Sequence, residues 1–234
     1  MGLWEHSNTV TNFGENVQFE PEGIESPANE QEVLELLQGH HGKKFRAFGS
    51  LHSWSRVTEC KDVAINLGEI QWVAIREGEQ PTVEVGAGCQ VKQLIAELNR
   101  HGYTLPSVGL IMEQTIAGAT ATATHGSGRH SLTHYIQSLR LATYDENGNP
   151  VIREIGEPER LNAVACGIGG FGIITSITLP IRKQYFVEEC IRSVDSIAQM
   201  LQGEEQYPLQ QSFFLPWSWE IFGATTAGSG CAAQ

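Results

Sequence analysis

Apolar residues recur at helical spacing near the start of the chain, within residues 30–41. The positions that fall on one face of this segment are Val33, Leu34, Leu36 and Leu37. Asn29 and Glu32 match a capping box at its start, and Gly42 is placed to end it. The pattern therefore predicts a helix with both ends marked.

Short apolar runs flank this helix and predict strands. Residues 17–19 precede it, and residues 44–48 and 63–67 follow it. The chain thus opens as β-α-β, and the strand at 44–48 leads directly into a turn-rich loop.

Two pairs of apolar segments predict β-hairpins further along the chain. Residues 73–75 and 82–85 flank a Glu-Gly-Glu-Gln-Pro turn, and residues 136–143 and 151–155 flank the turn Asp-Glu-Asn-Gly-Asn-Pro. A segment with helical spacing, residues 91–98, lies between the two hairpins. Local antiparallel pairing interleaved with helices predicts an α+β fold rather than a doubly wound parallel sheet.

A second domain is predicted to begin after Pro180. The chain there has the pattern of a strand, a helix and another strand, at residues 186–191, 194–201 and 211–215. We therefore divide the chain into residues 1–184 and residues 185–234. Residues 223–230 are small and lack hydrophobic periodicity, so a flexible tail is expected there.

The composition is that of an ordinary globular protein with an acidic charge balance. Of the 234 residues, 41% are hydrophobic, and 27 acidic against 15 basic residues give a formal net charge of −12. This balance argues against nucleic acid or an anionic membrane surface as a partner and favours small molecules. No apolar run approaches the roughly 18 residues of a membrane span, and the first residues lack a basic segment followed by an apolar one. A soluble, cytoplasmic protein is predicted.

Cysteines and histidines give no metal-binding pattern. The five cysteines are scattered and form no C-x-x-C pair: Cys60, Cys89, Cys166, Cys190 and Cys231. Buried free thiols are the favoured interpretation. No spaced carboxylate or cysteine completes a ligand set around His125, His130 and His134, so surface or hydrogen-bonding histidines are predicted and no metal is expected.

Two distant segments, residues 46–55 and 115–128, are rich in glycine, alanine and small hydroxyl residues. Such residues let main-chain amides approach a pyrophosphate closely, and side-chain hydroxyls can add further bonds. The candidates are Gly49, Ser50, Ser53, Thr122, Thr124, Gly126 and Ser127. Taken alone, the first segment is equally consistent with an ordinary turn, and the second with a tightly packed helix. Together they predict a large cofactor that carries phosphate.

His52 is the candidate reactive residue of the first segment. A lone histidine is often a core residue, but His52 lies among residues suited to a bend rather than on an apolar face. A neutral imidazole nitrogen is a competent nucleophile toward an electrophilic carbon of a cofactor.

Residues 167–172 match the G-x-G-x-x-G pattern of nicotinamide-binding Rossmann turns. That pattern requires a strand before it and a helix after it. Here the helix-like residues 161–166 precede it and the β-branched residues 173–179 follow it. We therefore interpret it as a helix-to-strand loop, and a nicotinamide-dependent Rossmann protein is the least favoured function.

In this order and spacing, residues 46–55, 115–128 and 167–179 resemble the PCMH-type FAD-binding domain of the vanillyl-alcohol oxidase family. Within that family the chain is most similar to the sugar-1,4-lactone oxidases, acting on L-gulonolactone or D-arabinono-1,4-lactone, and to the alditol oxidases. The resemblance covers residues 13–184 and implies a two-subdomain FAD-binding fold, followed by the start of an α+β cap domain. Residues 213–219 resemble the first cap strand and the loop after it.

The resemblance also implies which residues contact FAD. Residues 47–51 correspond to the pyrophosphate loop, His52 to the residue bonded covalently to the 8α-methyl carbon of the flavin, and Ser53 to its support. The implied cofactor-binding positions are Ala47, Phe48, Gly49, Ser50, Leu51, His52, Ser53, Gly109, Leu110, Thr115, Gly118, Thr122, Ala123, Thr124, His125, Ile173 and Ile174.

Two positions depart from the family pattern. Leu51 stands where the family usually has the glycine before the linking histidine, and Leu110 stands where a serine is expected after Gly109. Gly109 itself falls where related dehydrogenases carry a larger residue that shields the flavin from oxygen, so its small size favours an oxidase.

The function that the resemblance implies is oxidation of an alcohol group of a sugar, polyol or aldonolactone. Hydride passes to flavin N5, and O2 reoxidises the flavin to give H2O2. In the relatives the substrate residues lie in the cap domain and the C-terminal portion, so no catalytic residue is named in this chain. A C-terminally truncated family member that binds FAD with impaired or no turnover is expected. Two alternatives stay open: a flavin-binding module without catalysis, and a flavoprotein like the enolpyruvyl-sugar reductases, whose FAD is not covalently bound.

Overall fold

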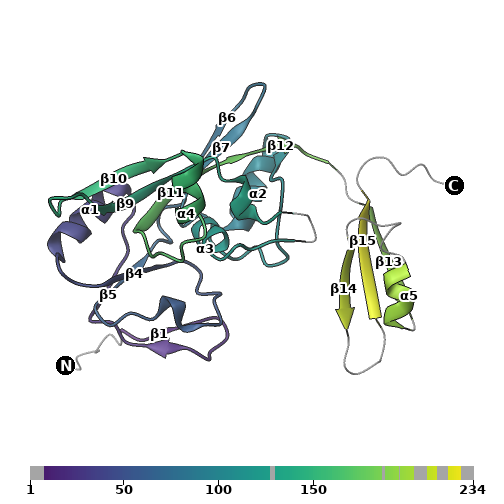
Figure 1. The fold of residues 1–234 in the computed structure, drawn as a ribbon, viewed down its shortest axis with the longest axis horizontal. Helices are drawn as coiled ribbons and strands as arrows, with labels where there is room; N and C mark the ends of the chain where they lie inside the picture. The colour runs from purple at the N-terminus through teal and green to yellow at the C-terminus, as the bar shows by residue number, and fades with distance from the viewer. Residues whose placement is uncertain are drawn as a thin grey trace, which may run out of the picture.

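The computed structural model describes residues 8–126, 130–185, 188–194, 196–202, 210–214 and 221–227 (Figure 1). The chain forms an α+β fold, as the sequence predicts. A small parallel sheet and a larger antiparallel sheet make up most of it, and no helix among the described residues is long and apolar enough to cross a membrane.

The parallel sheet contains a β-α-β unit, but its first strand is not the predicted segment 17–19, which lies in a separate antiparallel hairpin. Its strands are β3 (Gly23–Glu25), β5 (Val63–Asn66) and β4 (Phe45–Phe48), in that spatial order, and α1 (Glu30–Gly39) connects β3 to β4. A short hairpin of β1 (Val10–Thr11) and β2 (Gln18–Phe19) precedes it, and η1 (Arg56–Thr58) lies between β4 and β5.

The predicted cap of α1 is present, with one bond displaced. Asn29 accepts a hydrogen bond from the Glu32 backbone N–H at 3.0 Å. The carboxylate of Glu32 accepts its return bond from the Ala28 backbone N–H at 2.8 Å, one residue before the cap. Two backbone donors at the helix start are therefore satisfied.

The antiparallel sheet contains both predicted hairpins. Its order is β10 (Pro150–Ile155), β9 (Ser138–Tyr144), β11 (Ile173–Pro180), β7 (Thr82–Gly86) and β6 (Val73–Arg76). Outside this sheet, β8 (Tyr103–Thr104) pairs with β12 (Arg182–Lys183). The short helix η2 (Leu132–Tyr135) also lies outside it. The main core combines residues of this sheet with α2 (Val91–Arg100), α3 (Ile116–Ala121) and α4 (Pro158–Val164).

An ion pair connects α1 to the antiparallel sheet. Arg140 of β9 donates from Nε (2.7 Å) and Nη2 (2.6 Å) to the two carboxylate oxygens of Glu30, and Thr175 of β11 donates to the same carboxylate at 2.6 Å. The bonds from Arg140 hold the pKa of Glu30 below its ordinary value, because they stabilise the ionised carboxylate. This contact joins α1 to two neighbouring strands of the antiparallel sheet, β9 and β11.

The C-terminal elements form a separate sheet, which stands apart from the rest in Figure 1. Its spatial order is β13 (Glu188–Val194), β15 (Ile221–Ala227) and β14 (Gln210–Phe214), all antiparallel, with α5 (Ile197–Gln202) after β13. The predicted division of the chain after residue 184 stays a prediction.

One expectation for this part of the chain is wrong. Residues 223–230 are expected to be flexible, but residues 223–227 belong to β15, the central strand. Backbone pairing on both sides orders this strand, and it does not depend on the apolar periodicity that the sequence lacks. Residues 228–230 lie outside the described residues.

The prediction of buried free thiols holds for two of the three cysteines whose side chains the structure describes. Cys60 and Cys89 are buried and free, and burial raises the pKa of the Cys89 thiol to about 11. Cys166 is free but exposed, because it lies in the loop just after α4, so the expectation of burial is wrong there. Cys190 and Cys231 have side chains outside the described set.

Candidate functional site

The loop of residues 49–53 leaves the end of β4 at the edge of the parallel sheet. Its central residue Leu51 has φ +54°, in the left-handed region that favours glycine. The Leu51 side chain packs against a small apolar cluster that includes Phe48 and Val17. Leu51 thus adopts a left-handed backbone conformation that glycine, the usual residue of the family pattern, adopts more readily.

A run of free backbone donors lines this loop. Among the hydrogen bonds of the described residues, none uses the backbone N–H of any residue from 49 to 53. Consecutive free N–H groups around a left-handed residue are typical of anion-binding nests. The geometry therefore suits a phosphate group.

Gly49 brings this loop against the start of α3. A Cβ atom on Gly49 would lie 2.5 Å from Cγ2 and 2.8 Å from Cβ of Thr115. Thr115 is buried and caps α3, where its Oγ1 accepts a bond from the Gly118 backbone N–H at 3.4 Å. Only glycine fits at position 49 with this spacing, so the two small-residue segments of the sequence meet here.

A cavity of about 300 Å³ lies between the two segments. Among the described residues that line it, Arg46 is the only lysine or arginine and there is no aspartate or glutamate. Arg46 donates from Nη1 to the Ile168 carbonyl at 2.9 Å, which places its guanidinium at one side of the cavity. In a protein with a net charge of −12, a pocket wall without carboxylates favours an anionic ligand.

Two buried polar atoms of the same cavity lack partners. Gln114 Oε1 and Thr58 Oγ1 are both inaccessible to solvent and make no hydrogen bond in the described structure. Leaving such atoms unpaired costs about 1–3 kcal/mol each. A bound molecule with polar groups would satisfy them.

A second, wider cavity of about 750 Å³ lies on the other side of the loop. It shares Gly49, Ser50, His52 and Thr115 with the first cavity. The half-buried His52 therefore forms part of the wall between the two spaces. No hydrogen bond or ion pair of the described residues engages either ring nitrogen of His52.

The structure brings together most of the site residues that the sequence predicts. Eleven of them line the first cavity: Ala47, Phe48, Gly49, Ser50, Leu51, His52, Ser53, Thr115, Gly118, Thr122 and Ile174. The Ser50 hydroxyl already donates to the Glu113 carbonyl at 2.6 Å, so its backbone N–H is the group that remains available to a ligand.

The other six predicted residues do not line either cavity: Gly109, Leu110, Ala123, Thr124, His125 and Ile173. Gly109 packs against Thr124, since a Cβ on Gly109 would lie 2.8 Å from Thr124 Cγ2. Leu110 is 72% exposed, and Ile173 is buried in β11. Ser127 of the second segment lies outside the described residues.

Sequence reasoning missed Gln114 and Thr58, although both line the first cavity. It also missed Phe13, which lines the second. Gln114 directly precedes the predicted Thr115, but its unpaired oxygen arises from burial in three dimensions, which no local pattern signals.

The remaining motifs behave as structural elements. The glycine-rich residues 167–172 form a loop from α4 to β11, with Gly169 and Gly172 at positive φ, as predicted for a helix-to-strand connection. His134 Nδ1 lies 2.8 Å from Ser131 Oγ, and His125 Nδ1 lies 2.9 Å from the Gly126 carbonyl. No cluster of three potential metal ligands occurs among the residues that the structure describes.

Comparison with known proteins identifies similar chains. A family model described as "FAD binding domain" matches residues 21–151. The chain is 44% identical over 213 residues to a long-chain alcohol oxidase of an uncultured marine euryarchaeote, covering 90% of this chain and 44% of that protein. It is 33% identical over 165 residues to an L-gulono-1,4-lactone dehydrogenase of Mycobacterium tuberculosis, covering 68% and 37%.

A solved structure shows the same fold. Cholesterol oxidase from B. sterolicum superposes with a TM-score of 0.79 at 16% sequence identity, over 94% of this chain and 47% of that one. The chain thus spans less than half the length of these relatives. The free N–H groups, the glycine at position 49 and the unpaired polar atoms fit the pyrophosphate and polar groups of a dinucleotide.

Proposed function

The chain belongs to the PCMH-type FAD-binding domain family, and on this premise we propose that it binds FAD at the loop of residues 49–53. The cofactor pyrophosphate lies against the free N–H groups of this loop and near the start of α3. The rest of the cofactor extends into the two cavities on either side of His52. The observation that carries the proposal is the run of unpaired backbone donors beside a cavity wall without carboxylates.

The residues present meet the charge of a pyrophosphate by short-range contacts. Hydrogen bonds from N–H groups to an ionised oxygen contribute about 1.5–3 kcal/mol each. Arg46 adds a positive charge at the cavity wall. Gln114 and Thr58 supply polar atoms for the sugar or base of the dinucleotide. Together these groups favour a ligand with one anionic part and one polar part.

We further propose that His52 bonds covalently to the 8α-methyl carbon of FAD. Its ring nitrogens are free of protein partners, and the residue borders both cavities. In the net reaction the new C–N bond would replace one C–H bond of the methyl group and the N–H bond of the imidazole, and O2 would accept the resulting two protons and two electrons as H2O2. Leu51, which precedes His52, adopts a left-handed conformation that is accessible to the usual glycine.

The proposed activity of the whole protein is oxidation of a CH–OH group. When bound, FAD would supply the two-electron acceptor for the alcohol carbon, and O2 is the proposed final acceptor. The relatives are named for sugar lactones and for long-chain alcohols, so the substrate classes proposed are an aldonolactone or polyol first and a long-chain alcohol second. We propose that the 234-residue chain alone holds the flavin with little or no turnover.

Acid precipitation of the purified chain tests the linkage. The proposal predicts a yellow pellet for the natural chain, and a colourless pellet with yellow supernatant for His52→Ala that has bound FAD. A natural chain that releases all of its flavin into the supernatant contradicts the covalent bond and favours the reductase-type alternative.

Anaerobic mixing with substrates tests the activity. L-Gulono-1,4-lactone, xylitol and 1-dodecanol represent the three substrate classes, and loss of the 450 nm flavin absorbance reports electron transfer. The proposal predicts slow or no bleaching by this chain. Rapid bleaching by one of the three would contradict the expectation of impaired turnover and identify the substrate class.

A further inference from the structure

We propose that residues 12–17 act as a clasp that fixes the orientation of the His52 ring, and that Phe13 is its positioning residue. This segment precedes residues 21–151, which match the family model. The inference rests on the proposed bond between His52 and FAD. It assigns a role to a turn near the start of the chain that lies outside the residues matching the family model.

Three hydrogen bonds join the clasp to the backbone on both sides of His52. The Phe13 backbone N–H donates to the Leu51 carbonyl, and Asn12 Nδ2 donates to the Ser53 carbonyl, each at 2.9 Å. Asn16 Nδ2 donates to the Trp54 carbonyl, also at 2.9 Å. The chain immediately before and after His52 is therefore held by one short segment.

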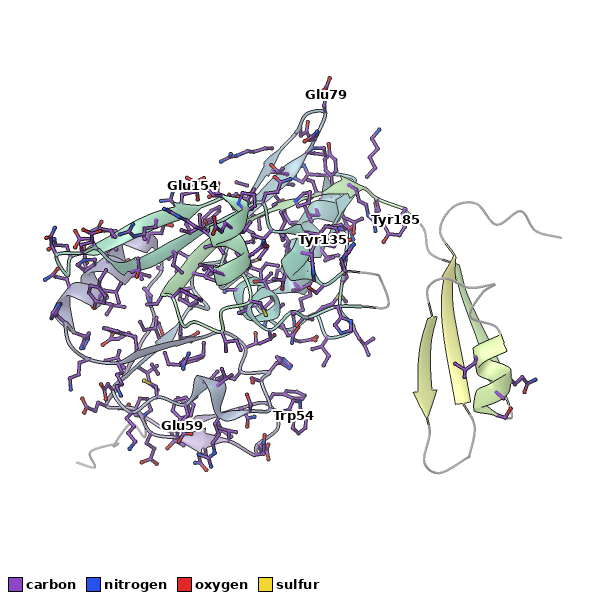
Figure 2. All side chains as sticks on the ribbon, in the orientation of Figure 1. Trp54, Glu59, Glu79, Tyr135, Glu154 and Tyr185 are labelled. Carbon is purple, nitrogen blue, oxygen red and sulfur yellow. The ribbon has the colours of Figure 1, made fainter. Side chains whose placement is uncertain are left out.

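The clasp is itself internally ordered. Asn12 is only 4% exposed, and its Oδ1 accepts a bond from the Val17 backbone N–H at 2.9 Å. Asn12 Nδ2 also donates to Asn16 Oδ1 at 2.8 Å. The turn packs tightly against Trp54, since a Cβ atom on Gly14 would lie 2.9 Å from the indole ring. Trp54 lies at the margin of the larger unit in Figure 2.

The Phe13 ring stacks on the imidazole of His52. Their centroids are 4.5 Å apart and the ring planes differ by 25°. Phe13 is 61% exposed, so burial alone does not explain where its side chain lies. The backbone bond to Leu51 places the ring, and the ring then covers one face of His52.

A stacked ring and a hydrogen-bonding partner have different consequences for a nucleophile. The lone pair of an imidazole nitrogen lies in the ring plane, at its edge, whereas stacking engages only the ring face. The Phe13 contact therefore restricts the ring plane and leaves both nitrogens of His52 free, as the structure shows. A carboxylate or carbonyl partner would instead occupy one nitrogen.

The effect of the stack follows from the strength of aromatic pairs. Removing it lowers the population of the oriented imidazole, and with it the rate of bond formation, by about 2- to 12-fold. Phe13 also lines the second cavity, into which the cofactor is proposed to extend, so its removal is expected to weaken the initial FAD affinity as well. The rate of bond formation is therefore compared at saturating FAD. In the balanced net reaction, a C–N bond replaces one C–H and one N–H bond, and O2 accepts the two protons and two electrons as H2O2.

The test compares Phe13→Ala and Phe13→Leu with Phe13→Tyr, which keeps a ring, in the full 234-residue chain. Trp72→Ala is the matched control, because Trp72 is an aromatic residue that is 42% exposed and lines neither cavity. Flavin-free protein is mixed with excess FAD in air, and the acid-stable flavin is measured against time. A separate titration gives the initial FAD affinity.

A second readout reports the stack without any flavin. In protein labelled at histidine, the ring protons of His52 are expected to shift upfield through the Phe13 ring current in the natural chain and in Phe13→Tyr. In Phe13→Ala and Phe13→Leu, the chemical shifts of these protons are expected to return toward ordinary histidine values. An unshifted signal in the natural chain overturns the proposed geometry.

Slower acid-stable loading at saturating FAD in Phe13→Ala and Phe13→Leu, with recovery in Phe13→Tyr, supports the clasp. Loading of Phe13→Ala at the natural rate overturns the clasp and leaves the His52 linkage standing. A rate loss that disappears at saturating FAD also overturns it, since Phe13 would then act only on FAD binding. If the natural chain forms no acid-stable flavin, the linkage itself fails and the clasp fails with it.

Discussion

Replacing Gly49 by alanine is expected to disturb the cofactor loop directly. The new methyl group would lie within 2.8 Å of three Thr115 atoms, well inside the 3.5–4.0 Å at which carbon atoms attract each other. Either the 49–53 loop or the start of α3 must move by about 1 Å. Overpacking of this kind costs about 1–3 kcal/mol, so we expect Gly49→Ala to lose about 2 kcal/mol of unfolding free energy.

Urea unfolding of the flavin-free chain measures this loss. With a slope of about 2 kcal/mol per molar urea, the midpoint is expected to fall by about 1 M. Gly39→Ala is the matched control, because a Cβ there meets nothing within 4 Å and lies in the last turn of α1. It is expected to leave stability unchanged or raise it by up to about 1 kcal/mol.

The same variant is expected to weaken FAD binding by at least about tenfold, since displacement of even one charge-assisted N–H contact costs about 1.5 kcal/mol or more. Thr115→Ala removes two of the three crowding atoms, so the double variant should recover about 1 kcal/mol of the loss in a double-mutant cycle. A Gly49→Ala protein with natural stability and natural FAD affinity would refute the assignment of this contact.

Three further predictions concern the framework. Glu30→Gln is expected to lower the free energy of unfolding by about 1.5 kcal/mol at pH 7. Because folding lowers the pKa of Glu30, the difference in stability between the two proteins should shrink as the pH falls below 4.5. A difference in urea midpoints that stays constant from pH 7 to pH 3 would contradict this. Leu94→Ala should lose about 3 kcal/mol, because the side chain is fully buried. Leu110 is 72% exposed, so Leu110→Ala should change the unfolding free energy by less than about 0.5 kcal/mol. Equal losses of stability in Leu94→Ala and Leu110→Ala would contradict the described core. Peptide mapping after thiol labelling at pH 8 should find Cys166 modified and Cys89 unmodified, since burial raises the Cys89 pKa to about 11; early modification of Cys89 would show that its site is open.

Local patterns were sufficient to predict most of the fold. The capping residues Asn29 and Glu32 and the hairpin turn at residues 145–150 act through their immediate neighbours, so their structural effect is visible in the sequence. β15 was missed because its order comes from two distant strands, β13 and β14, rather than from its own residue pattern.

The candidate site was predictable only in part, for a related reason. The small residues around Gly49 and Thr115 mark a close approach of backbone to ligand, and the structure does bring them together. The unpaired oxygen of Gln114 and the stacking of Phe13 on His52 arise from contacts between segments far apart in the chain.

The most direct test of the account is the stoichiometry of FAD binding by the purified flavin-free chain. Protein from a host deprived of riboflavin is titrated with FAD in a calorimeter, beside Gly49→Ala and Gly39→Ala. Binding at the 49–53 loop predicts one FAD per chain, binding of Gly39→Ala like the natural chain, and binding of Gly49→Ala weakened by at least about tenfold. A folded natural chain that shows no saturable binding, or a Gly49→Ala chain that binds FAD equally well, would contradict a cofactor site at this loop.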